Sequence, residues 1–150
     1  MVSLAKKNKG FTIVELLIVI VVIGILATLV IVTFTGIQQK GRNAQRQTDI
    51  NALNGHVEAY YAQTGYYPTV DNVNDLDFRR DNMKGLDPEA LKDPKATGPN
   101  INDGASSATQ YGYAVSPAGC NNTTTLCDTY VLTATLEGSS PAVVYTKRSN

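Results

Sequence analysis

The sequence has no tryptophan, one histidine (His56) and two cysteines (Cys120 and Cys127) among its 150 residues. The cysteines are separated by six residues, so they do not form the Cys-x-x-Cys motif of thiol redox catalysts. With one distant histidine, they provide too few ligands for a structural zinc site. No serine or cysteine nucleophile and carboxylate are arranged around His56, which is expected on a helix surface or in helix packing. We therefore predict that the chain is not an enzyme and has no metal or cofactor.

The sequence also lacks an excess of either charge, because 13 basic residues balance 13 acidic ones. This balance excludes a global field that would draw the chain to nucleic acid or anionic lipid. The charges are unevenly distributed, however. Lys6, Lys7 and Lys9 all precede an apolar segment, and without these three the chain has ten basic residues against 13 acidic ones.

Charge is absent from the 24 residues between Glu15 and Lys40. As a helix they would extend about 36 Å, which exceeds the roughly 30 Å hydrocarbon core of a bilayer. A secretory signal has a shorter apolar region followed by a small-residue cleavage site. A cleaved signal and a plain uncleaved anchor are alternative interpretations. Neither accounts for Glu15, because a carboxylate facing lipid alone at that depth is unfavourable.

The stretch Lys9-Gly10-Phe11-Thr12-Ile13-Val14-Glu15-Leu16-Leu17 resembles the processing site of type IV pilins and their pseudopilin relatives. The strongest match covers residues 6 to about 36. The resemblance implies cleavage after Gly10 by a membrane-embedded prepilin peptidase on the cytoplasmic side. It also implies N-methylation of the new first residue, Phe11. The ten-residue leader and the Phe start resemble the type IVa group.

The chemistry of these residues agrees with such processing. Gly10 has no Cβ, so an extended backbone can enter a protease cleft there. Cleavage leaves a positively charged amine at Phe11, and Glu15 is its natural counter-charge. In a helical stack, the carboxylate of one subunit could meet the Phe11 amine of its neighbour and so favour assembly. The alternative is a carboxylate that only reaches toward the membrane interface.

Beyond the apolar segment the helix is expected to continue. Ile50, Leu53, Val57 and Tyr60 recur at spacings of three, four and three, which makes one apolar face. The polar residues expected around this face are Gln38, Gln39, Lys40, Arg42, Asn43, Gln45, Arg46, Gln47 and Asn51.

This helix is predicted to end before Gly65, a plausible residue just past a helix, with Pro68 beyond it. From Phe11 it would be about 80 Å long if straight, which suits a subunit that polymerises by packing rods together. Gly24 and Thr28 form a small-xxx-small step that permits close helix approach in lipid, although a glycine is also simply tolerated in membrane helices. Many pilins have a proline where this chain has Val32, so a proline kink is not expected.

The segment 65–110 is rich in proline, asparagine and aspartate and is predicted to be mainly a loop connection. Asp87-Pro88-Glu89 is typical of a helix start, and Asp93-Pro94 would stop that short helix. Oxygen-bearing side chains cluster earlier, at Asp71, Asn72, Asn74, Asp75 and Asp77. Some major pseudopilins bind calcium in a head-domain loop. The spacing is not that of an EF-hand, so a solvated loop is favoured.

Strands are predicted at 111–115, 129–136 and 142–146. In the second, Tyr130, Leu132, Ala134 and Leu136 share one face, which is expected to pack against the helix. The expected fold class is α+β. A long N-terminal helix, membrane-spanning in its first half, packs against an antiparallel meander of three or four strands.

Cys120 and Cys127 lie between the first two strands. In an oxidising exterior they should form a disulfide, which the chain-entropy relation values at roughly 2–3 kcal/mol. Asn121 and Asn122 begin N-x-T sequons, a weak indication of a modifiable loop.

We thus expect five segments: a leader (1–10), a transmembrane and filament-core half-helix (11–36), an amphipathic half-helix (37–64), a connection (65–110), and an antiparallel sheet with a disulfide loop (111–150). The function expected is that of a prepilin, the structural subunit of a type IV pilus. A pseudopilin of a type II secretion or DNA-uptake system is the alternative. A membrane-anchored binding domain with no filament role is a lesser one.

The expected partners are further copies of the chain, prepilin peptidase, the assembly machinery of the cytoplasmic membrane, and lipid before assembly. The leader is expected in the cytoplasm and the C-terminal head outside, with the assembled pilus extracellular. Lys40, Arg42 and Arg46 could meet lipid headgroups, neighbouring subunits or DNA. No basic-aromatic groove supports a nucleic-acid partner.

Overall fold

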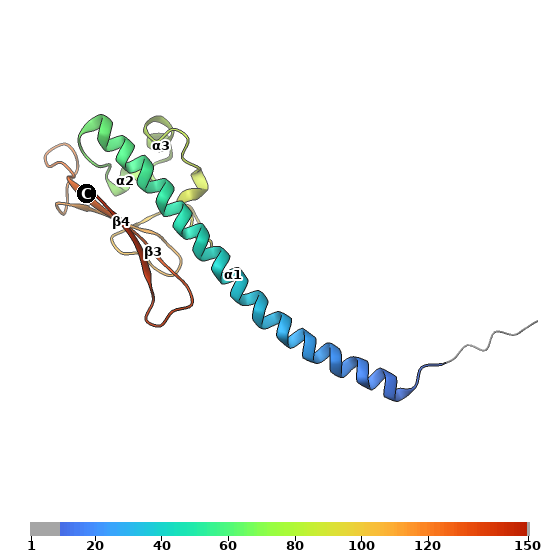
Figure 1. Cartoon of the computed structure of the whole chain (residues 1–150). Coiled ribbons are helices and arrows are strands. Elements are labelled where there is room, and N and C mark those ends of the chain that lie inside the picture. The colour runs from blue at the N-terminus through green and yellow to red at the C-terminus, as the bar shows by residue number, and fades with distance from the viewer. Residues whose placement is uncertain (1–9, 150) are drawn as a thin grey trace, which may run out of the picture. The chain divides into compact units, whose positions relative to one another are not determined.

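The computed structural model describes residues 10–149, so Lys6, Lys7 and Lys9 of the expected leader lie outside the described residues. The chain forms two units, Met1–Gln38 and Gln39–Asn150. Helix α1 (Ile13–Thr64) is continuous and contributes residues to both (Figure 1). Helix α1 ends at Thr64 because Gly65 has a positive φ of 81°, a conformation that favours glycine. The predicted end of the helix is therefore confirmed.

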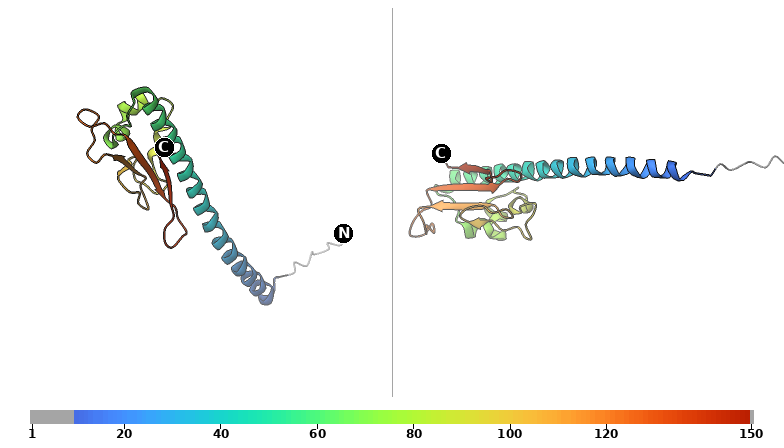
Figure 2. Two further views of the ribbon diagram at one scale, coloured as in Figure 1. Left: turned by 60° about the vertical axis from the view of Figure 1, so that its left-hand side comes forward. Right: turned by 90° about the horizontal axis from the view of Figure 1, so that it is seen from below.

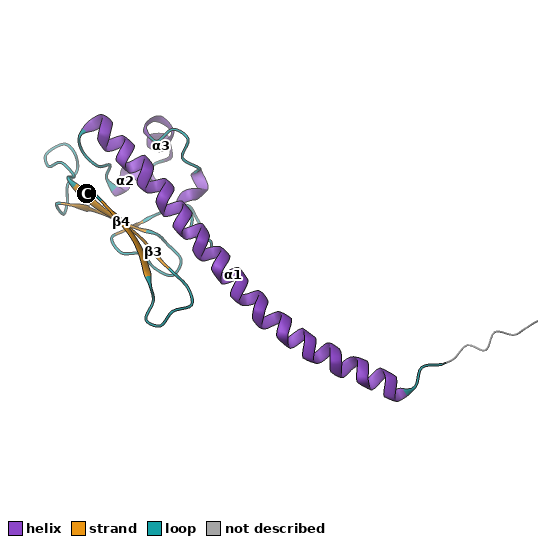
Figure 3. Ribbon diagram, viewed as in Figure 1, coloured by secondary structure: helices purple, strands orange, loops and turns teal. Residues whose placement is uncertain are grey.

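The second unit has the predicted α+β fold, with the head half of α1 beside a mixed sheet (Figures 1 and 3). Its further elements are α2 (Val70–Asn74), α3 (Leu76–Asn82), the 3₁₀ helix η1 (Pro88–Leu91), β1 (Asn102–Asp103), β2 (Gly112–Ser116), β3 (Thr129–Thr135) and β4 (Val144–Arg148). The strand order is β1-β2-β3-β4. Strands β2, β3 and β4 form the predicted antiparallel meander, whereas β1 pairs with β2 in parallel.

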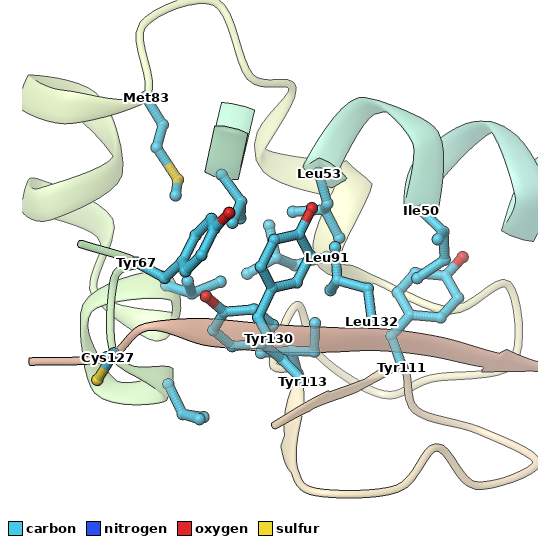
Figure 4. Close-up of a cluster of buried hydrophobic side chains, with 14 of the residues drawn as sticks. Ile50, Leu53, Tyr67, Met83, Leu91, Tyr111, Tyr113, Cys127, Tyr130 and Leu132 are labelled. Atoms are coloured by element: carbon cyan, nitrogen blue, oxygen red, sulfur yellow. The ribbon is translucent and has the colours of Figure 1, made fainter. Parts of the chain in front are cut away.

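The predicted apolar face of α1 packs against the sheet. Ile50, Leu53 and Val57 are fully buried, and Tyr60 is nearly so. From β3, Tyr130 and Leu132 contribute the facing layer, as the alternation of that strand predicts. Figure 4 shows Ile50 and Leu53 of the helix meeting side chains of the strands, among them Leu132. Figure 2 shows the strands along one side of the head half of α1.

Tyrosine hydroxyl groups fix this helix on the sheet. The hydroxyl group of Tyr111 donates a hydrogen bond to Asp49 Oδ2 (2.7 Å), and that of Tyr130 donates to Glu58 Oε1 (2.7 Å). Burial raises the pKa of both phenols, so they remain protonated donors. Burial also raises the pKa of the Asp49 carboxyl group, despite the favourable hydrogen bond from Tyr111. Each tyrosine thus contributes both apolar packing and an orienting polar contact.

The connection between α1 and the sheet contains more helix than predicted. Thr69 and Asn72 form a reciprocal capping box at the start of α2. Asp75 ends α2, and its side chain accepts the backbone N–H of Phe78 at the start of α3. Asparagine and aspartate thus cap helices here, which explains why a composition typical of loops conceals two of them. The short helix predicted after Asp87 is present as η1.

The predicted disulfide is confirmed. Cys120 and Cys127 are joined in the connection between β2 and β3, with their Cα atoms 5.3 Å apart. Both cysteines are buried, and the carbonyl oxygen of Cys127 accepts a hydrogen bond from the backbone N–H of Tyr67 (2.8 Å). The disulfide loop is therefore attached to the segment that follows α1.

The prediction that Arg46 belongs to the polar surface of α1 is wrong. Arg46 has no exposed surface, and it binds Asp93 through two hydrogen bonds, Nε to Oδ2 (2.6 Å) and Nη2 to Oδ1 (3.0 Å). Its Nη1 donates to Glu137 Oε1 (2.7 Å). These acids are 47 and 91 residues away in sequence, so helical periodicity could not reveal them. Arg46 therefore joins α1, the connection and the β3–β4 loop, and it is not available to lipid or DNA.

Glu137 is the common acceptor of this cluster. Arg42 donates to it through Nε (2.9 Å) and Nη2 (2.6 Å), and Lys95 Nζ lies 2.8 Å from Glu137 Oε2. The side chain of Asn43 binds the backbone carbonyl oxygen and N–H of Glu137, each at 2.9 Å. The hydrogen bonds from Arg42, followed by those from Lys95 and Arg46, hold the pKa of Glu137 far below its ordinary value. We call these residues, with Asp93, the Glu137 cluster.

The Glu137 cluster should make the head less stable in acid. Because the pKa of Glu137 is lowered by folding, its contribution is fully present above the unfolded pKa of about 4.3 and is lost as the pH falls below that value. We expect Glu137→Gln to lower the free energy of unfolding at pH 7 by on the order of 2 kcal/mol. The difference from the wild type should shrink progressively below about pH 4. Urea unfolding of the full chain between pH 7 and pH 3, followed by tyrosine fluorescence, measures both effects.

Glu89→Gln is the matched control, because Glu89 pairs only with a half-exposed Lys92 at 3.2 Å. It should leave unfolding almost unchanged over the same pH range. A constant gap between Glu137→Gln and the wild type down to pH 3 would contradict the assigned role of the Glu137 carboxylate.

Gly112 in β2 lies beneath a backbone crossing on the outer face of the sheet. A Cβ atom there would collide with the backbone of Gly104, Ala105 and Ser106. The crossing is held by Thr133, whose Oγ1 accepts the backbone N–H of Ser106 (3.0 Å). Only glycine therefore permits this close approach.

We expect Gly112→Ala to destabilise the head by about 1–3 kcal/mol, because backbone atoms cannot yield as flexible side chains do. Gly98→Ala is the control, since a Cβ atom there would meet no other atom within 4 Å. Its free energy of unfolding should stay within about 1 kcal/mol of the wild type. Equal stabilities of the two variants in urea would refute the close approach at Gly112.

Candidate functional site

Gly10, Phe11 and Thr12 precede helix α1 and are exposed. The Phe11 residue is 83% exposed, and no atom lies within 4 Å of the position that a Cβ on Gly10 would take. The Gly10–Phe11 peptide bond is therefore accessible and lies outside regular structure, as a protease substrate requires.

Thr12 and Glu15 form a capping box at the start of α1. The backbone N–H and the hydroxyl group of Thr12 each donate a hydrogen bond to Glu15 Oε2 (2.8 Å for both). In return, the backbone N–H of Glu15 donates to Thr12 Oγ1 (3.2 Å). The box satisfies two donors that a helix start leaves without partners and stops the helix short of Gly10.

Reasoning from the sequence missed this local partner of Glu15. The available signal was a threonine three residues before a glutamate at the head of an apolar run, the pattern of a capping box. Within the described residues, all hydrogen bonds to the Glu15 carboxylate go to Oε2. Oε1 therefore keeps its acceptor capacity for a group from outside.

The first half of α1 presents an uncharged and mainly apolar surface beyond Glu15. Its large side chains up to Ile37 are all roughly half exposed or more, and no described part of the chain buries them. An 18-residue window of the helix has a mean hydropathy of 3.3, so α1 is long and apolar enough to cross a membrane. At its start, Phe11, Glu15, Leu16 and Val19 line a hollow of about 360 Å³.

The hydroxyl groups in this half are satisfied inside the helix. Thr28 Oγ1 donates to the carbonyl oxygen of Gly24 (2.6 Å), and Thr33 Oγ1 donates to that of Val30 (3.0 Å). These contacts allow threonine in an apolar environment, and the helix continues through Thr33, Thr35 and Gly36. These residues have weak helix propensity, yet α1 is continuous there. A Cβ on Gly24 would meet nothing within 4 Å, which leaves this step open to another helix.

The acidic stretch considered for calcium is used mainly in local structure. The side chains of Asn72 and Asp75 cap α2 and α3. The Asn74 side chain binds the backbone of Ile101 at 2.9 and 3.0 Å, and Asp77 pairs with Arg80 (2.8 Å). The side chains of Asn72, Asn74, Asp75 and Asp77 thus have partners within the chain.

The remaining candidate residues are His56 and the two sequon asparagines, Asn121 and Asn122. His56 is half-buried on α1. The Asn121 side chain accepts the backbone N–H groups of Thr123 (3.0 Å) and Thr124 (2.9 Å) and so forms a turn. Asn122 has a positive φ of 57°, and its Nδ2 donates to the carbonyl oxygen of Tyr67 (2.7 Å). Of the two sequons, only that of Asn121 has an amide nitrogen without a hydrogen-bond partner among the described residues.

Known proteins resemble the N-terminal part of this chain. The family described as "Prokaryotic N-terminal methylation motif" matches residues 5–31. "Type II secretion system core protein G" of Escherichia coli (strain K12) is 38% identical over 63 residues, which are 42% of this chain and 43% of that protein. The protein of the same name from Vibrio cholerae is 36% identical over 66 residues, 44% of this chain and 45% of that protein.

"Type IV major pilin protein PilA" of Myxococcus xanthus is 34% identical over 70 residues, 47% of this chain and 29% of that protein. The chain thus spans less than half the length of these curated relatives. No solved structure matches. The methylation motif in residues 5–31, the long helix with its α+β head, and relatives of both kinds support a type IV pilin-like family, which includes pilins and pseudopilins.

Proposed function

We propose that the chain is a prepilin, cleaved after Gly10, N-methylated at Phe11 and polymerised into a type IV pilus through its N-terminal helix. The observation that carries this proposal is the environment of Glu15. Its carboxylate is bound on one oxygen by Thr12 and has its other oxygen open, beside an exposed Phe11 and an uncharged apolar helix. A membrane anchor alone does not need such a carboxylate.

The capping box supports the processing step. Because Thr12 caps the helix, residues 10–12 stay non-helical and can extend into a peptidase cleft. Cleavage there creates an amine at Phe11, four residues before Glu15 and two residues closer to it than Lys9, the end of the basic cluster. Prepilin peptidase is accordingly the first partner that we propose.

Assembly follows from the remaining capacity of Glu15. The new amine of one subunit is a cation in an apolar environment, and the open Oε1 of Glu15 in an adjacent subunit is a suitable acceptor. The pairing removes two unfavourable charges from lipid at once, whereas each monomer in the membrane must keep both. Association of apolar half-helices, with close approach at Gly24 and Thr28, would supply the packing.

The membrane location follows from the same half-helix. In this proposal residues 11–36 cross the cytoplasmic membrane before assembly, with the leader in the cytoplasm and the head outside. Assembly then moves the half-helix from lipid into the filament core, and the pilus becomes extracellular. The disulfide between Cys120 and Cys127 agrees with a head in an oxidising compartment.

A pseudopilin of a type II secretion or DNA-uptake system is the second candidate. The relatives named type II secretion system core protein G favour it as strongly as the pilin relative favours a pilus. The two functions differ in where the filament ends. Imaging of surface filaments and assay of secreted proteins in a deletion strain separate them: loss of long filaments supports the pilin, and loss of secretion with no change in filaments supports the pseudopilin.

The first prediction from this proposal concerns processing. The mature chain should begin at N-methyl-Phe11, so intact-mass and N-terminal peptide analysis should show the loss of residues 1–10 and the gain of one methyl group. Gly10→Val should block the cleavage, because a β-branched side chain hinders the extended substrate at the scissile bond. Gly24→Val is the control and should be cleaved normally. Recovery of residues 1–10 in the wild-type membrane form would reject the proposal.

The second prediction separates the two roles of Glu15. Glutamine also serves at the third position of a capping box, so Glu15→Gln should keep the start of α1 but lose the charge. Glu15→Leu should lose both. If pairing with the Phe11 amine drives assembly, both variants should be cleaved and inserted, and both should yield at least about tenfold less filament.

Filaments are sheared from cells that carry only one variant, and the sheared and membrane fractions are blotted. Thr12→Val is the matched control, because it removes the capping hydroxyl group and leaves the Glu15 charge. It should assemble better than Glu15→Gln. A normal yield from Glu15→Gln would show that Glu15 acts only as a helix cap.

A further inference from the structure

A cavity of about 460 Å³ lies in the connection between α1 and the sheet, away from the N-terminal site. Leu76 of α3, Met83 at its end and Leu86 beyond it provide apolar walls. The volume falls in the range of small-ligand sites, and a mostly apolar lining with a few polar groups is typical of them. The described fold gives no structural use for this space.

Arg79 gives the cavity its chemistry. It is only 6% exposed, yet no carboxylate of the described residues lies within ion-pair distance of it. Within the described residues its side chain makes one hydrogen bond, from Nη1 to the carbonyl oxygen of Val73 (2.5 Å). Burial lowers the pKa of Arg79, and the distant charge of Asp75 offsets this only in part. A buried guanidinium group without a counter-ion is costly, in contrast to Arg46, which has two carboxylate partners.

The remaining nitrogen atoms of Arg79 are accessible. Within the described residues no fully buried side-chain nitrogen or oxygen atom lacks a hydrogen-bond partner. Nε and Nη2 of Arg79 have no partner there, so both have accessible surface, and Arg79 is one of the residues that line the cavity. A guanidinium group offers donors in a planar fork that matches a carboxylate.

The other charged residues at the cavity agree with an anionic ligand. Arg80 and Lys84 also line it, and no acidic residue does. The nearby Asp77 and Asp81 are bound to Arg80, at 2.8 and 3.0 Å. Lys84 has no ion pair in the described part of the chain. The cavity thus combines one buried cation, Lys84 at its rim and aliphatic walls.

We infer that this cavity binds a carboxylate attached to an aliphatic group, with the carboxylate on Arg79 and the aliphatic group between Leu76, Met83 and Leu86. Two sources share this chemistry: a short fatty acid, and the C-terminal residue of a peptide that ends in leucine or a similar side chain. The inference does not depend on the proposed filament function.

Met83 provides a direct reporter. The sequence has two methionines, Met1 and Met83, so methyl-¹³C methionine labelling gives at most two signals. Met83 is 2% exposed and lines the cavity, and Figure 4 shows its side chain on the side of the core where Tyr67 lies. The experiment is methyl NMR of the full chain in lipid nanodiscs, titrated with hexanoate and, separately, with N-acetyl-glycyl-leucine.

At least one of these carboxylates should shift the Met83 signal saturably, with a dissociation constant on the order of 1 mM for so small a ligand. The matched amides, hexanamide and N-acetyl-glycyl-leucinamide, should bind about tenfold or more weakly, because they lack the charge. Inorganic phosphate, which lacks the aliphatic group, should also bind more weakly. Tighter binding of hexanoate supports a fatty acid, and tighter binding of the peptide supports a C-terminus.

Arg79→Gln should weaken binding by about tenfold or more, while Arg148→Gln, an exposed arginine on β4, should leave it unchanged. The comparison of acid with amide uses the wild-type chain. It therefore tests whether the cavity binds the carboxylate even if Arg79→Gln fails to fold. No shift of Met83 with either carboxylate would overturn the inference. Equal affinity for acid and amide, or for phosphate and hexanoate, would overturn it as well.

Discussion

The first half of helix α1 has no partner within the described chain, and this constraint governs the rest of the protein. The segment from Leu16 to Gln39 is uncharged, and its large apolar side chains are exposed. Such a surface is unstable in water and must be covered by lipid or by other helices. The capped helix start, the open oxygen of Glu15 and the accessible Gly10 all lie at one end of it. The proposed processing and assembly would therefore act on the exposed apolar half-helix.

The second half of the same helix, in contrast, is held within the head. The head holds it with an apolar face on α1 and with long-range polar contacts at its margins. Tyr111 and Tyr130 reach from the sheet to carboxylates on the helix, and Arg46 binds acids from two other segments. A buried ion pair adds little net stability, because its attraction offsets the cost of desolvation only when the charged groups are accurately placed. The Glu137 cluster is thus best understood as a device that fixes which segments meet.

The sequence predicted those features that depend on local patterns. Periodicity identified the buried face of α1 and the inner face of β3, and the cysteine spacing indicated the disulfide. Local patterns do not reveal pairings between residues that are far apart in the sequence. The helical pattern therefore places Arg46 on the surface, although the fold buries it. In the connection, Thr69 and Asp75 are capping residues whose signals were present but were outweighed by a composition typical of loops. Thr12 before Glu15 is also a capping signal. An external partner for the Glu15 charge does not require this local contact, so the expectation for Glu15 does not include it.

The capping box changes the physical meaning of that charge. A glutamate without a local partner would be unfavourable in the membrane, and only a cation from outside the chain would stabilise its carboxylate. Glu15 is instead bound by Thr12 in the single chain, so its carboxylate already has hydrogen-bond donors before any partner arrives. Because the box occupies one oxygen and leaves the other, the proposed assembly would add a contact without first breaking one. In the proposed filament, the drive to assemble would then be smaller than that of a bare carboxylate, and subunits would return to the membrane more readily.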